Sequence, residues 1–367
     1  MPGVTSAAGP VHLGMDTSKN SIVAGILMPG EEVPVLDRIW NEEGSVRHLT
    51  GRLGEVSALR ACYEAGACGF GLHRLLASMG VACDVVAPSL IPRRPGDRGK
   101  TGKRDASRLA RLLRAGGLTP IRVPAGAEEA VRDLVRARAA LLADRNRAQQ
   151  RVTAMLMRHG RIWRSGSSWT QAHERWIAGQ RFDEPALAAT FAHYRAAPDT
   201  RLAELDAVEA GLAPWAGREP LGLLVARLGC YRGIAELTGL TLAAEVAGWR
   251  RFPSARAFTG FTGLVPAGYS SGERVRRGSI TRTGSGPART ALIEASWAYR
   301  HKPAIGVALR RRQAGASPGT LARSWQAQRR LHARYQALTA RGKPPGMALT
   351  AVARELAGFA WAEMTSS

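Results

Sequence analysis

Two acidic residues, Asp16 and Glu64, each come at the end of a predicted strand. The segment 11–27, VHLGMDTSKNSIVAGIL, alternates apolar with smaller or polar residues up to Asp16, and the strand predicted from residue 58 ends at Glu64. A carboxylate on a buried strand is held rigidly, so it is well placed to bind a metal ion or a metal-bound phosphate. The alternative for Asp16 is a structural role, because Asp often opens a turn such as the one predicted at 17–20.

A third acid, Asp105, stands where a basic loop gives way to a helix. The loop at 88–104, PSLIPRRPGDRGKTGKR, is rich in proline, glycine, lysine and arginine. The helix that is predicted to begin at Asp105, DASRLARLLRAGG, carries leucines on one face. Asp is a favourable helix N-cap, and a negative charge is stabilised at a helix N-terminus. Capping therefore explains Asp105, taken by itself, as well as chemistry does.

A glycine-rich basic loop is predicted at 268–287, with the sequence GYSSGERVRRGSITRTGSGP. Glycines let a backbone approach phosphate closely, and arginines stabilise its charge. A serine in such a loop can be a nucleophile, although a serine beside glycine is more often a turn residue. No histidine lies close in the sequence to act as a base, so activation by a metal or by arginine is favoured over a catalytic triad.

The elements that must position the two strand-end acids follow a β-β-β-α-β-α-β order over residues 11–87. This order is that of a mixed α/β fold and matches an RNase H-like core. In such a core Asp16 on the first strand and Glu64 on the fourth strand are neighbours across the sheet. The sequence therefore predicts that the two carboxylates lie together.

The rest of the chain is predicted to be mainly helical. An uninterrupted pattern over 128–159 predicts one long helix, which usually packs against a partner helix within or between chains. A second helix is predicted at 185–209. The segment 237–246, LTGLTLAAEV, resembles the hairpin of a helix-hairpin-helix unit, in which backbone N–H groups bind phosphate; an ordinary helical corner is the alternative. The basic segment 310–343 is expected either to contact nucleic acid or to be a solvated surface.

The composition indicates a polyanionic partner. The chain has 367 residues with 52 Lys plus Arg against 29 Asp plus Glu, so its formal net charge is +23. A charge of this size is most simply explained by nucleic-acid binding. A genome-wide bias towards Arg, Ala and Gly is the alternative, but it does not explain the shortage of acids.

The cysteines and the apolar runs indicate a cytosolic protein without a membrane segment. None of the four cysteines is in a CxxC pair, so we expect reduced core cysteines rather than a metal site. No apolar run reaches 18 residues, and the N-terminus lacks the charged and apolar regions of a secretion signal.

Four separated segments together resemble a known family. Three of them are GMDTSKNSIVAGI with Asp16, CYEAGACGFGLHRLL with Glu64 and PGDRGKTGKRDASRLARLLRAG with Asp105. They are similar to the N-terminal RuvC-like "DEDD" domain of the insertion sequence 110 family of transposases. The fourth, residues 252–298, resembles the C-terminal transposase domain of that family. The two domains occur in the expected order over about residues 10 to 310.

The resemblance implies a DNA recombinase that excises and inserts its own mobile element. Its carboxylates, Asp16, Glu64 and Asp105, are expected to hold Mg²⁺ or Mn²⁺, and Ser271 to form a covalent link to DNA, with Ser270 as the adjacent contender. A structured non-coding bridge RNA is expected to pair with donor and target DNA. The active site is expected to combine residues of different subunits in a dimer or tetramer, located in the bacterial cytoplasm at the nucleoid.

One position departs from the family pattern. The family has Lys-Thr-Asp-x-x-Asp-Ala, whereas this chain has Lys100-Thr-Gly-Lys-Arg-Asp105-Ala, so Gly102 replaces the third acid. We rank three explanations in order: three carboxylates suffice, because phosphate and water supply the other metal ligands; Asp97 reaches in from the loop; or the protein is impaired.

The residues expected to contact nucleic acid are basic and lie in the two loops. The arginines near Ser271 are also placed to stabilise the charge of a phosphoryl transition state. The set comprises Arg93, Arg94, Lys100, Lys103, Arg104, Arg274, Arg276, Arg277 and Arg282.

We therefore expect four segments: a RuvC-like metal-binding domain at 10–125, a coiled-coil spacer at 126–222, a mainly α transposase domain with the serine loop at 223–311, and a basic tail at 312–367. A sugar kinase or actin-like ATPase also opens with a strand and Asp, but the second glycine-rich phosphate hairpin of that class is not found. A non-catalytic RNA- or DNA-binding protein, such as a decayed transposase, is the stronger alternative because of Gly102.

Overall fold

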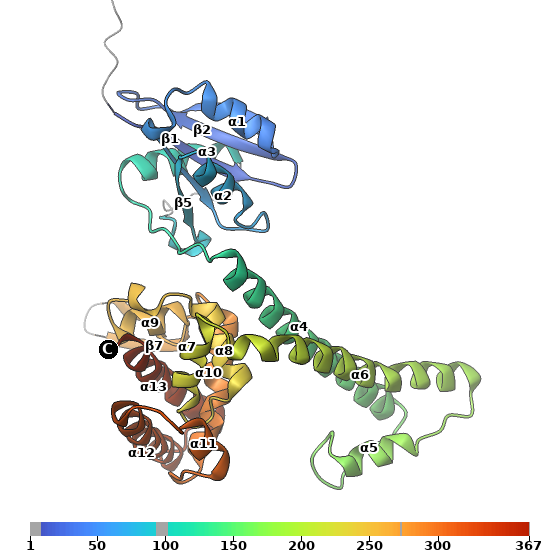
Figure 1. The fold of residues 1–367 in the computed structure, drawn as a ribbon. Coiled ribbons are helices and arrows are strands. Elements are labelled where there is room, and N and C mark those ends of the chain that lie inside the picture. Colours follow the sequence, from blue (N-terminus) through green and yellow to red (C-terminus); the bar gives the residue numbers. More distant parts are fainter. Residues whose placement is uncertain (1–8, 93–101, 272–273, 367) are drawn as a thin grey trace, which may run out of the picture. The chain divides into compact units, whose positions relative to one another are not determined.

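The computed structural model describes residues 9–92, 102–271 and 274–366, with the backbone alone at 269–271 and 274–277. The chain forms two compact units, Met1–Val123 and Pro124–Ser367. The first unit is built on a sheet and the second is mainly helical (Figure 1).

The N-terminal unit has the predicted mixed α/β order of elements. Its strands and helices are β1 (Val11–Thr17), β2 (Ser21–Leu27), β3 (Val35–Trp40), α1 (Glu43–Gly51), β4 (Leu59–Glu64), α2 (Gly71–Ser78), β5 (Ala82–Val86) and α3 (Gly102–Arg114). The five strands form one sheet in the order β3-β2-β1-β4-β5. The pairs β1–β2 and β2–β3 are antiparallel, whereas β1–β4 and β4–β5 are parallel. The alternation of apolar residues thus predicted this sheet correctly.

The two faces of the sheet pack against different helices. On one face Leu13 and Met15 belong to a core with Leu49 of α1 and Leu76 of α2. On the other face Cys62 of β4 packs with Leu109 of α3. Because side chains alternate along a strand, residues two apart lie on the same face. The strand ends therefore present every second side chain to α3.

Helix α3 lies unusually close to the sheet because two paired glycines face it. Gly14 of β1 is the register partner of Gly25 of β2. A Cβ added at Gly14 would lie 2.2 Å from the Ala110 backbone nitrogen, and one at Gly25 would lie 2.7 Å from the Ala106 carbonyl oxygen. The absence of side chains at both positions lets the α3 backbone rest on the strands.

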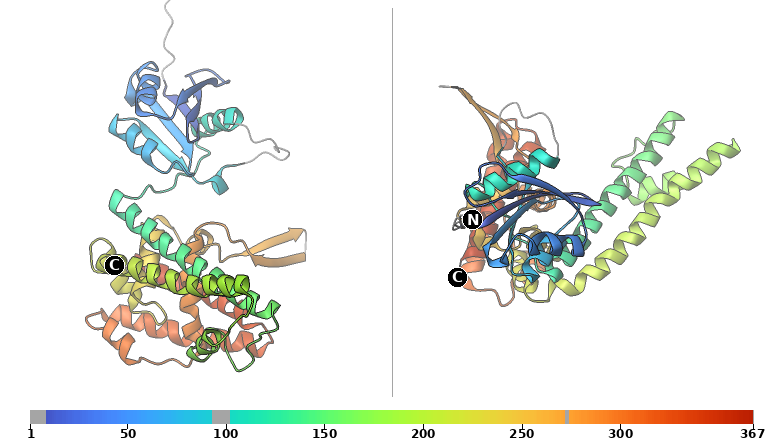
Figure 2. Two further views of the ribbon diagram at one scale, coloured as in Figure 1. Left: turned by 90° about the vertical axis from the view of Figure 1, so that its right-hand side faces the viewer. Right: turned by 90° about the horizontal axis from the view of Figure 1, so that it is seen from above.

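A helical arm forms the first part of the C-terminal unit. The predicted long helix is confirmed as α4 (Gly126–Arg158), and α6 (Pro185–Leu212) runs beside it, with α5 (Gln171–Ala178) between them in the chain (Figures 1 and 2). Near one end of the arm Val131 and Val135 pack with Leu212. Near the other end Met155 packs with Phe191. The long helix thus finds a partner helix within its own chain.

The remaining helices are α7 (Leu221–Gly229), α8 (Glu236–Val246), α9 (Ala255–Phe261), α10 (Gly286–Ser296), α11 (Val307–Arg312), α12 (Pro318–Ala340) and α13 (Pro345–Thr365). All of them except α11 contribute buried residues to one core. The core joins Leu242 of α8 and Leu292 of α10 to Leu331 of α12 and Leu356 of α13. The segment 312–367, predicted as a basic tail, therefore contains the two long helices α12 and α13. These helices pack in the same core as residues of 223–311.

Two local predictions in this unit are wrong. The segment 237–246, read as the hairpin of a helix-hairpin-helix unit, lies entirely within α8, and the turn that precedes this helix contains Gly233 at φ +85°. The glycine-rich segment predicted as a loop forms an antiparallel hairpin of β6 (Pro266–Ser271) and β7 (Arg274–Ile280), which projects from the helices (Figure 2). This hairpin is held by the pairing of its two strands. Its sequence lacks the alternation of apolar and polar residues from which a strand is predicted, so sequence analysis did not find it.

Among the residues described, no helix is both long enough and apolar enough to cross a membrane. The four cysteines form no disulfide; Cys62 and Cys230 are buried, whereas Cys68 and Cys83 are partly exposed. Burial raises the pKa of the Cys62 thiol, so this thiol stays protonated.

Candidate active site

Asp16 and Glu64 occupy equivalent positions on adjacent parallel strands. The β1–β4 register pairs Gly14 with Cys62 and Met15 with Tyr63, and the next residues on the two strands are Asp16 and Glu64. The predicted adjacency of these residues on the sheet is therefore confirmed. Their chemical roles remain predictions.

Both acids stand on the sheet face that α3 covers. Two residues before Asp16, Gly14 meets the α3 backbone. Two residues before Glu64, the Cys62 thiol donates to the Leu109 carbonyl oxygen of α3 at 3.7 Å. The period of two along a strand places Asp16 and Glu64 on this same face, at the carboxyl ends of their strands.

The first residue of α3 lies directly against Asp16. A Cβ added at Gly102 would be 2.5 Å from the Asp16 Oδ2 atom and 3.6 Å from the Val23 Cγ2 atom. The position at which the resemblance expects a further acid is thus beside the first carboxylate. With glycine there, the Asp16 carboxylate occupies the place where a side chain at position 102 would begin.

Asp105 is not the N-cap of its helix. It lies in the first turn of α3, three residues after the helix begins at Gly102, and is only 8% exposed. Its Oδ1 atom accepts a hydrogen bond from the Arg108 guanidinium at 2.9 Å. Its Oδ2 atom is buried and accepts no hydrogen bond from the described residues. Because a buried carboxylate oxygen is costly to leave unsatisfied, this atom is suited to a ligand that the described residues do not supply.

These residues fit a divalent cation in their chemistry. Carboxylate oxygens are the ligands that Mg²⁺ and Mn²⁺ prefer, and the buried Asp105 Oδ2 atom lacks a partner within the described ranges. As the side chains stand, however, no three His, Cys, Asp or Glu residues in the part of the chain that the structure describes lie together as a metal-binding group. The structure thus brings two carboxylates together on the sheet and places Asp105 on the covering helix.

Two residues near these acids were missed by sequence reasoning. Arg108 neutralises Asp105 by an ion pair of 2.9 Å, and its i, i+3 spacing on the predicted helix was a signal that could have found it. Asp84 of β5 is the register partner of Cys62, so it lies on the face that carries Glu64. Asp84 stands in the last of the predicted strands, but no local pattern marks it as a neighbour of Glu64.

The structure describes only some of the residues predicted to act in the first loop. The basic residues Arg93, Arg94 and Lys100 and the acid Asp97 lie outside the described residues. Lys103 and Arg104 are exposed in the first turn of α3. Two cations therefore accompany the helix end that lies against Asp16.

The candidate serines lie on the projecting hairpin of the C-terminal unit. Ser271 ends β6 and pairs with Arg274, and Ser270 pairs with Val275, while Tyr269 and Gly268 pair with Arg276 and Arg277. Arg282 is exposed after β7, in a left-handed conformation at φ 56°. Ser285, a further serine of this stretch, instead caps α10 and donates to the Glu245 carboxylate at 3.0 Å. The hairpin backbone thus places three of the predicted arginines, Arg274, Arg276 and Arg277, on the strand opposite both serines.

Two family models match the chain. A DEDD transposase model of the IS110 family matches residues 13–160, and the model described as "Transposase IS116/IS110/IS902 family" matches residues 226–308. The first match covers the sheet with its acids and α3, and it supports an RNase H-like α/β fold for that part. The second covers helices α8 to α10 and the hairpin with Ser271.

Two relatives extend the similarity over most of the chain. A Sinorhizobium fredii protein named as a transposase, y4qE, is 41% identical over 355 residues, which cover 95% of this chain and 87% of the relative. The transposase for insertion sequence element IS1533 of Leptospira borgpetersenii is 29% identical over 339 residues, which cover 91% of this chain and 98% of the relative. With two domain matches in the expected order and a relative of this similarity, the chain belongs to the IS110 family of transposases.

Proposed function

We propose that this transposase excises and inserts its element with two groups of side chains, the carboxylates Asp16, Glu64 and Asp105 and the hydroxyl of Ser271. The observation that carries the proposal is the pairing of Asp16 with Glu64 at the carboxyl ends of β1 and β4, on the face covered by the first turn of α3. Asp105 in that turn offers a buried carboxylate oxygen without a partner among the described residues.

The carboxylates would hold Mg²⁺ or Mn²⁺. A bound divalent ion supplies charge neutralisation, which lets a phosphodiester approach a group of acids that would otherwise repel it. Asp16 and Glu64 are fixed by the sheet, and the Asp105 carboxylate is oriented by Arg108. Lys103 and Arg104 stand on the exposed side of the same turn, where they can contact a DNA phosphate.

Ser271 would act as the nucleophile. A serine hydroxyl is weak until it is activated, and arginines stabilise the charge that develops on the attacked phosphate. The hairpin supports this role because Ser271 lies at the end of β6, paired with Arg274 on β7. Ser270 is the alternative nucleophile.

A structured guide RNA and a homo-oligomer complete the proposal. The net charge of +23 supports a large polyanionic partner. Sequencing of the RNA that co-purifies with the protein tests the guide, which is expected to be one foldable non-coding species encoded beside the gene. Light scattering with and without this RNA tests the assembly, and a monomer in both conditions contradicts it.

The carboxylates are tested by three variants, Asp16→Asn, Glu64→Gln and Asp105→Asn. Each should abolish metal-dependent strand cleavage and leave nucleic-acid affinity nearly unchanged, because loss of a ligand charge weakens metal binding but not the basic surface. Asp37→Asn is the matched control, since Asp37 lies on the edge strand β3 of the same sheet and pairs with Arg52. A variant that cleaves like the parent protein removes its residue from the proposed ligands.

A second function, nucleic-acid binding without catalysis, is favoured by one observation. Gly102 stands beside Asp16 where the family pattern has an acid. A protein that lost this ligand would bind RNA and DNA without cutting them. Absence of strand cleavage by the unaltered protein with Mg²⁺ and with Mn²⁺, in a preparation that binds its RNA, would favour this function over the first.

A further inference from the structure

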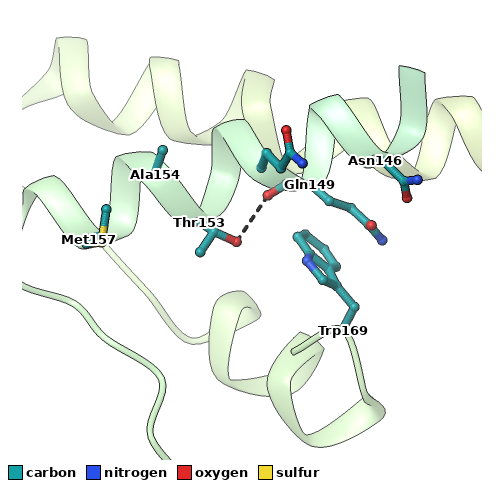
Figure 3. Close-up of a pocket in the computed structure, with 7 residues that line it drawn as sticks. Asn146, Gln149, Thr153, Ala154, Met157 and Trp169 are labelled. Atoms are coloured by element: carbon teal, nitrogen blue, oxygen red, sulfur yellow. Dashed lines mark hydrogen bonds between the residues drawn. The ribbon is translucent and has the colours of Figure 1, made fainter. Parts of the chain in front are cut away.

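A hollow of about 480 Å³ lies on the helical arm, between α4 and the loop that precedes α5 (Figure 3). Its α4 wall carries three amide side chains, those of Asn146, Gln149 and Gln150. The indole of Trp169 rises from the loop to face this wall. The volume is in the range of small-molecule sites, and no charged side chain is among the residues that line it.

The amide wall is a regular stripe of one helix. The lining residues of α4 recur every three or four positions, and they end with Thr153, Ala154 and Met157. The Thr153 hydroxyl is occupied by the carbonyl oxygen of Gln149 at 3.1 Å, so the amides are the polar groups available to a ligand. Met157, which is 60% exposed, adds an apolar end to the stripe.

Trp169 is held in a conformation that bulky residues rarely adopt. Its φ of 60° lies in the left-handed region, which is strained for a residue of this size. The backbone N–H of Trp169 donates a hydrogen bond to the Nδ1 atom of the buried His173 at 2.8 Å. The centroids of the Trp169 and His173 rings are 5.6 Å apart, and the rings meet edge to face. His173 in turn stacks on Trp176 at 5.7 Å. The aromatic cluster therefore fixes the indole in place before any ligand binds.

An uncharged hollow with an indole and three amides matches the chemistry of a nucleobase. A base stacks on an aromatic ring and offers donors and acceptors at its edge, and an amide side chain can both donate and accept. Stacking of this kind is used by proteins that bind single strands. A charged ligand would find no ion-pair partner among the lining residues.

The surroundings of the hollow suit the phosphates that flank a base. The segment 144–181 contains two acids, Asp144 and Glu174, against eight arginines, of which Arg147 pairs with Asp144. These arginines are Arg145, Arg147, Arg151, Arg158, Arg161, Arg164, Arg175 and Arg181. In such a segment the arginines can attract the phosphates of a nucleic acid, and the uncharged hollow can contact a base.

We infer that this hollow binds one unpaired nucleobase of a single-stranded or looped nucleic acid, which stacks on Trp169 and forms hydrogen bonds with the amides of α4. The site belongs to neither the carboxylates of the sheet nor the serine hairpin. It gives the helical arm a nucleic-acid contact of its own.

The test compares strands that differ only in their bases. The full-length protein is titrated with oligodeoxyadenylate and with an abasic deoxyribose-phosphate strand of the same length and charge, and oligoadenylate RNA forms a parallel arm. We expect the base-bearing strand to bind the parent protein about tenfold more tightly, because the abasic strand has no base to stack on Trp169. Trp169→Ala should reduce this preference to near unity, and Trp169→Phe should retain most of it. The RNA and DNA arms identify which strand occupies the site.

A variant on the exposed face of α4 tests the site even if Trp169→Ala disrupts the fold of its loop. Gln150→Leu should lower the preference for bases several-fold, whereas Gln171→Ala, an exposed glutamine outside the hollow, should leave it unchanged. The inference is overturned if neither Trp169→Ala nor Gln150→Leu changes the preference. It is also overturned if Gln150→Leu changes only the mass measured by light scattering, because the stripe would then be a contact between copies of α4.

A cross-link locates the base directly. Trypsin releases residues 165–175, SGSSWTQAHER, as one peptide in which Trp169 is the only tryptophan. A single strand that carries 5-iodouridine should cross-link to this peptide in the unaltered protein. Cross-links confined to other peptides would contradict the site.

Discussion

Gly102 lies so close to Asp16 that a Cβ at position 102 would be 2.5 Å from the Asp16 Oδ2 atom. A contact this short requires the Asp16 carboxylate to turn whenever residue 102 has a side chain. The residue type at position 102, in the first turn of α3, therefore affects the orientation of the Asp16 carboxylate at the end of β1.

This proximity makes Gly102→Asp a direct test of the metal site. A second carboxylate beside Asp16 adds like-charge repulsion that a divalent ion relieves. We expect a lower Tm than that of the parent protein in chelator and a larger rise in Tm on addition of Mg²⁺ or Mn²⁺. A tenfold gain in metal affinity corresponds to about 1.4 kcal/mol at saturation. Gly102→Ala, which displaces Asp16 without adding a ligand, is the control and should not gain metal dependence. Equal metal-induced shifts in all three proteins would count against the site.

The close packing of α3 on the sheet predicts the effect of Gly14→Ala. The new Cβ would lie 2.2 Å from the Ala110 backbone nitrogen and 2.4 Å from the Ala106 carbonyl oxygen, neither of which can turn away. We expect a loss of about 1–3 kcal/mol or more in the free energy of unfolding, measured by urea denaturation. Gly44→Ala in α1, where a Cβ would meet nothing within 4 Å, should be neutral or slightly stabilising. Similar stabilities of the two variants would argue against this packing.

The serine mechanism predicts a covalent protein–DNA adduct that one hydroxyl supports. Ser271→Ala should still bind RNA and DNA but form no adduct on denaturing gels with labelled DNA, because the attacking oxygen is gone. Ser270→Ala is the neighbouring control on β6 and should retain the adduct. The reverse result would transfer the role to Ser270, and an adduct in both variants would end the serine mechanism for this hairpin.

The excess of basic residues predicts a strong dependence of nucleic-acid affinity on salt. With a net charge of +23, binding should release many counterions, so the logarithm of the association constant should fall steeply and linearly with the logarithm of salt concentration. We expect a structured RNA to bind more tightly than duplex DNA of equal length at every salt concentration. Filter binding measures both, and a flat slope would show that the charge is not used for binding.

We expect the buried carboxylate of Glu363 to stabilise the C-terminal unit. Glu363 is fully buried in α13, and it accepts hydrogen bonds from Arg227 at 3.0 Å and Arg323 at 2.7 Å. Glu363→Gln should cost about 1.5–3 kcal/mol of unfolding free energy, because it weakens the charge-assisted hydrogen bonds from the partly exposed Arg227 and Arg323. Glu355→Gln on the same helix is the control, since Glu355 pairs with the more exposed Arg330 and Arg334. It should cost less than about 1 kcal/mol.

The same carboxylate predicts a pH dependence. Burial alone would raise the pKa of Glu363, but hydrogen bonds from Arg323, Thr320 and Arg227 outweigh it and lower the pKa below the ordinary value of 4.5. The unfolded chain then binds the proton more readily, so stability is present above about pH 4.5 and is lost as the pH falls through the lower folded value. The loss should be smaller in Glu363→Gln, and identical acid unfolding profiles would contradict this assignment.

The sequence by itself determined the elements whose signals are local. The alternation around Asp16 and the apolar run that ends at Glu64 predicted two strands of one mixed sheet, and the periodic pattern at 128–159 predicted α4. These signals are reliable because each strand or helix buries one face, and burial imposes its period on the residues. The adjacency of Asp16 and Glu64 followed from the order of the elements.

Tertiary structure decided what depends on contacts between distant segments. Asp105 reads as an N-cap in the sequence, but packing of α3 on Gly14 and Gly25 extends the helix back to Gly102 and buries Asp105. The hairpin with Ser271 has no apolar alternation, because hydrogen bonds between its strands rather than a buried face define it. The hollow beside Trp169 arises from α4 and a separate loop, and no local pattern records where two segments meet.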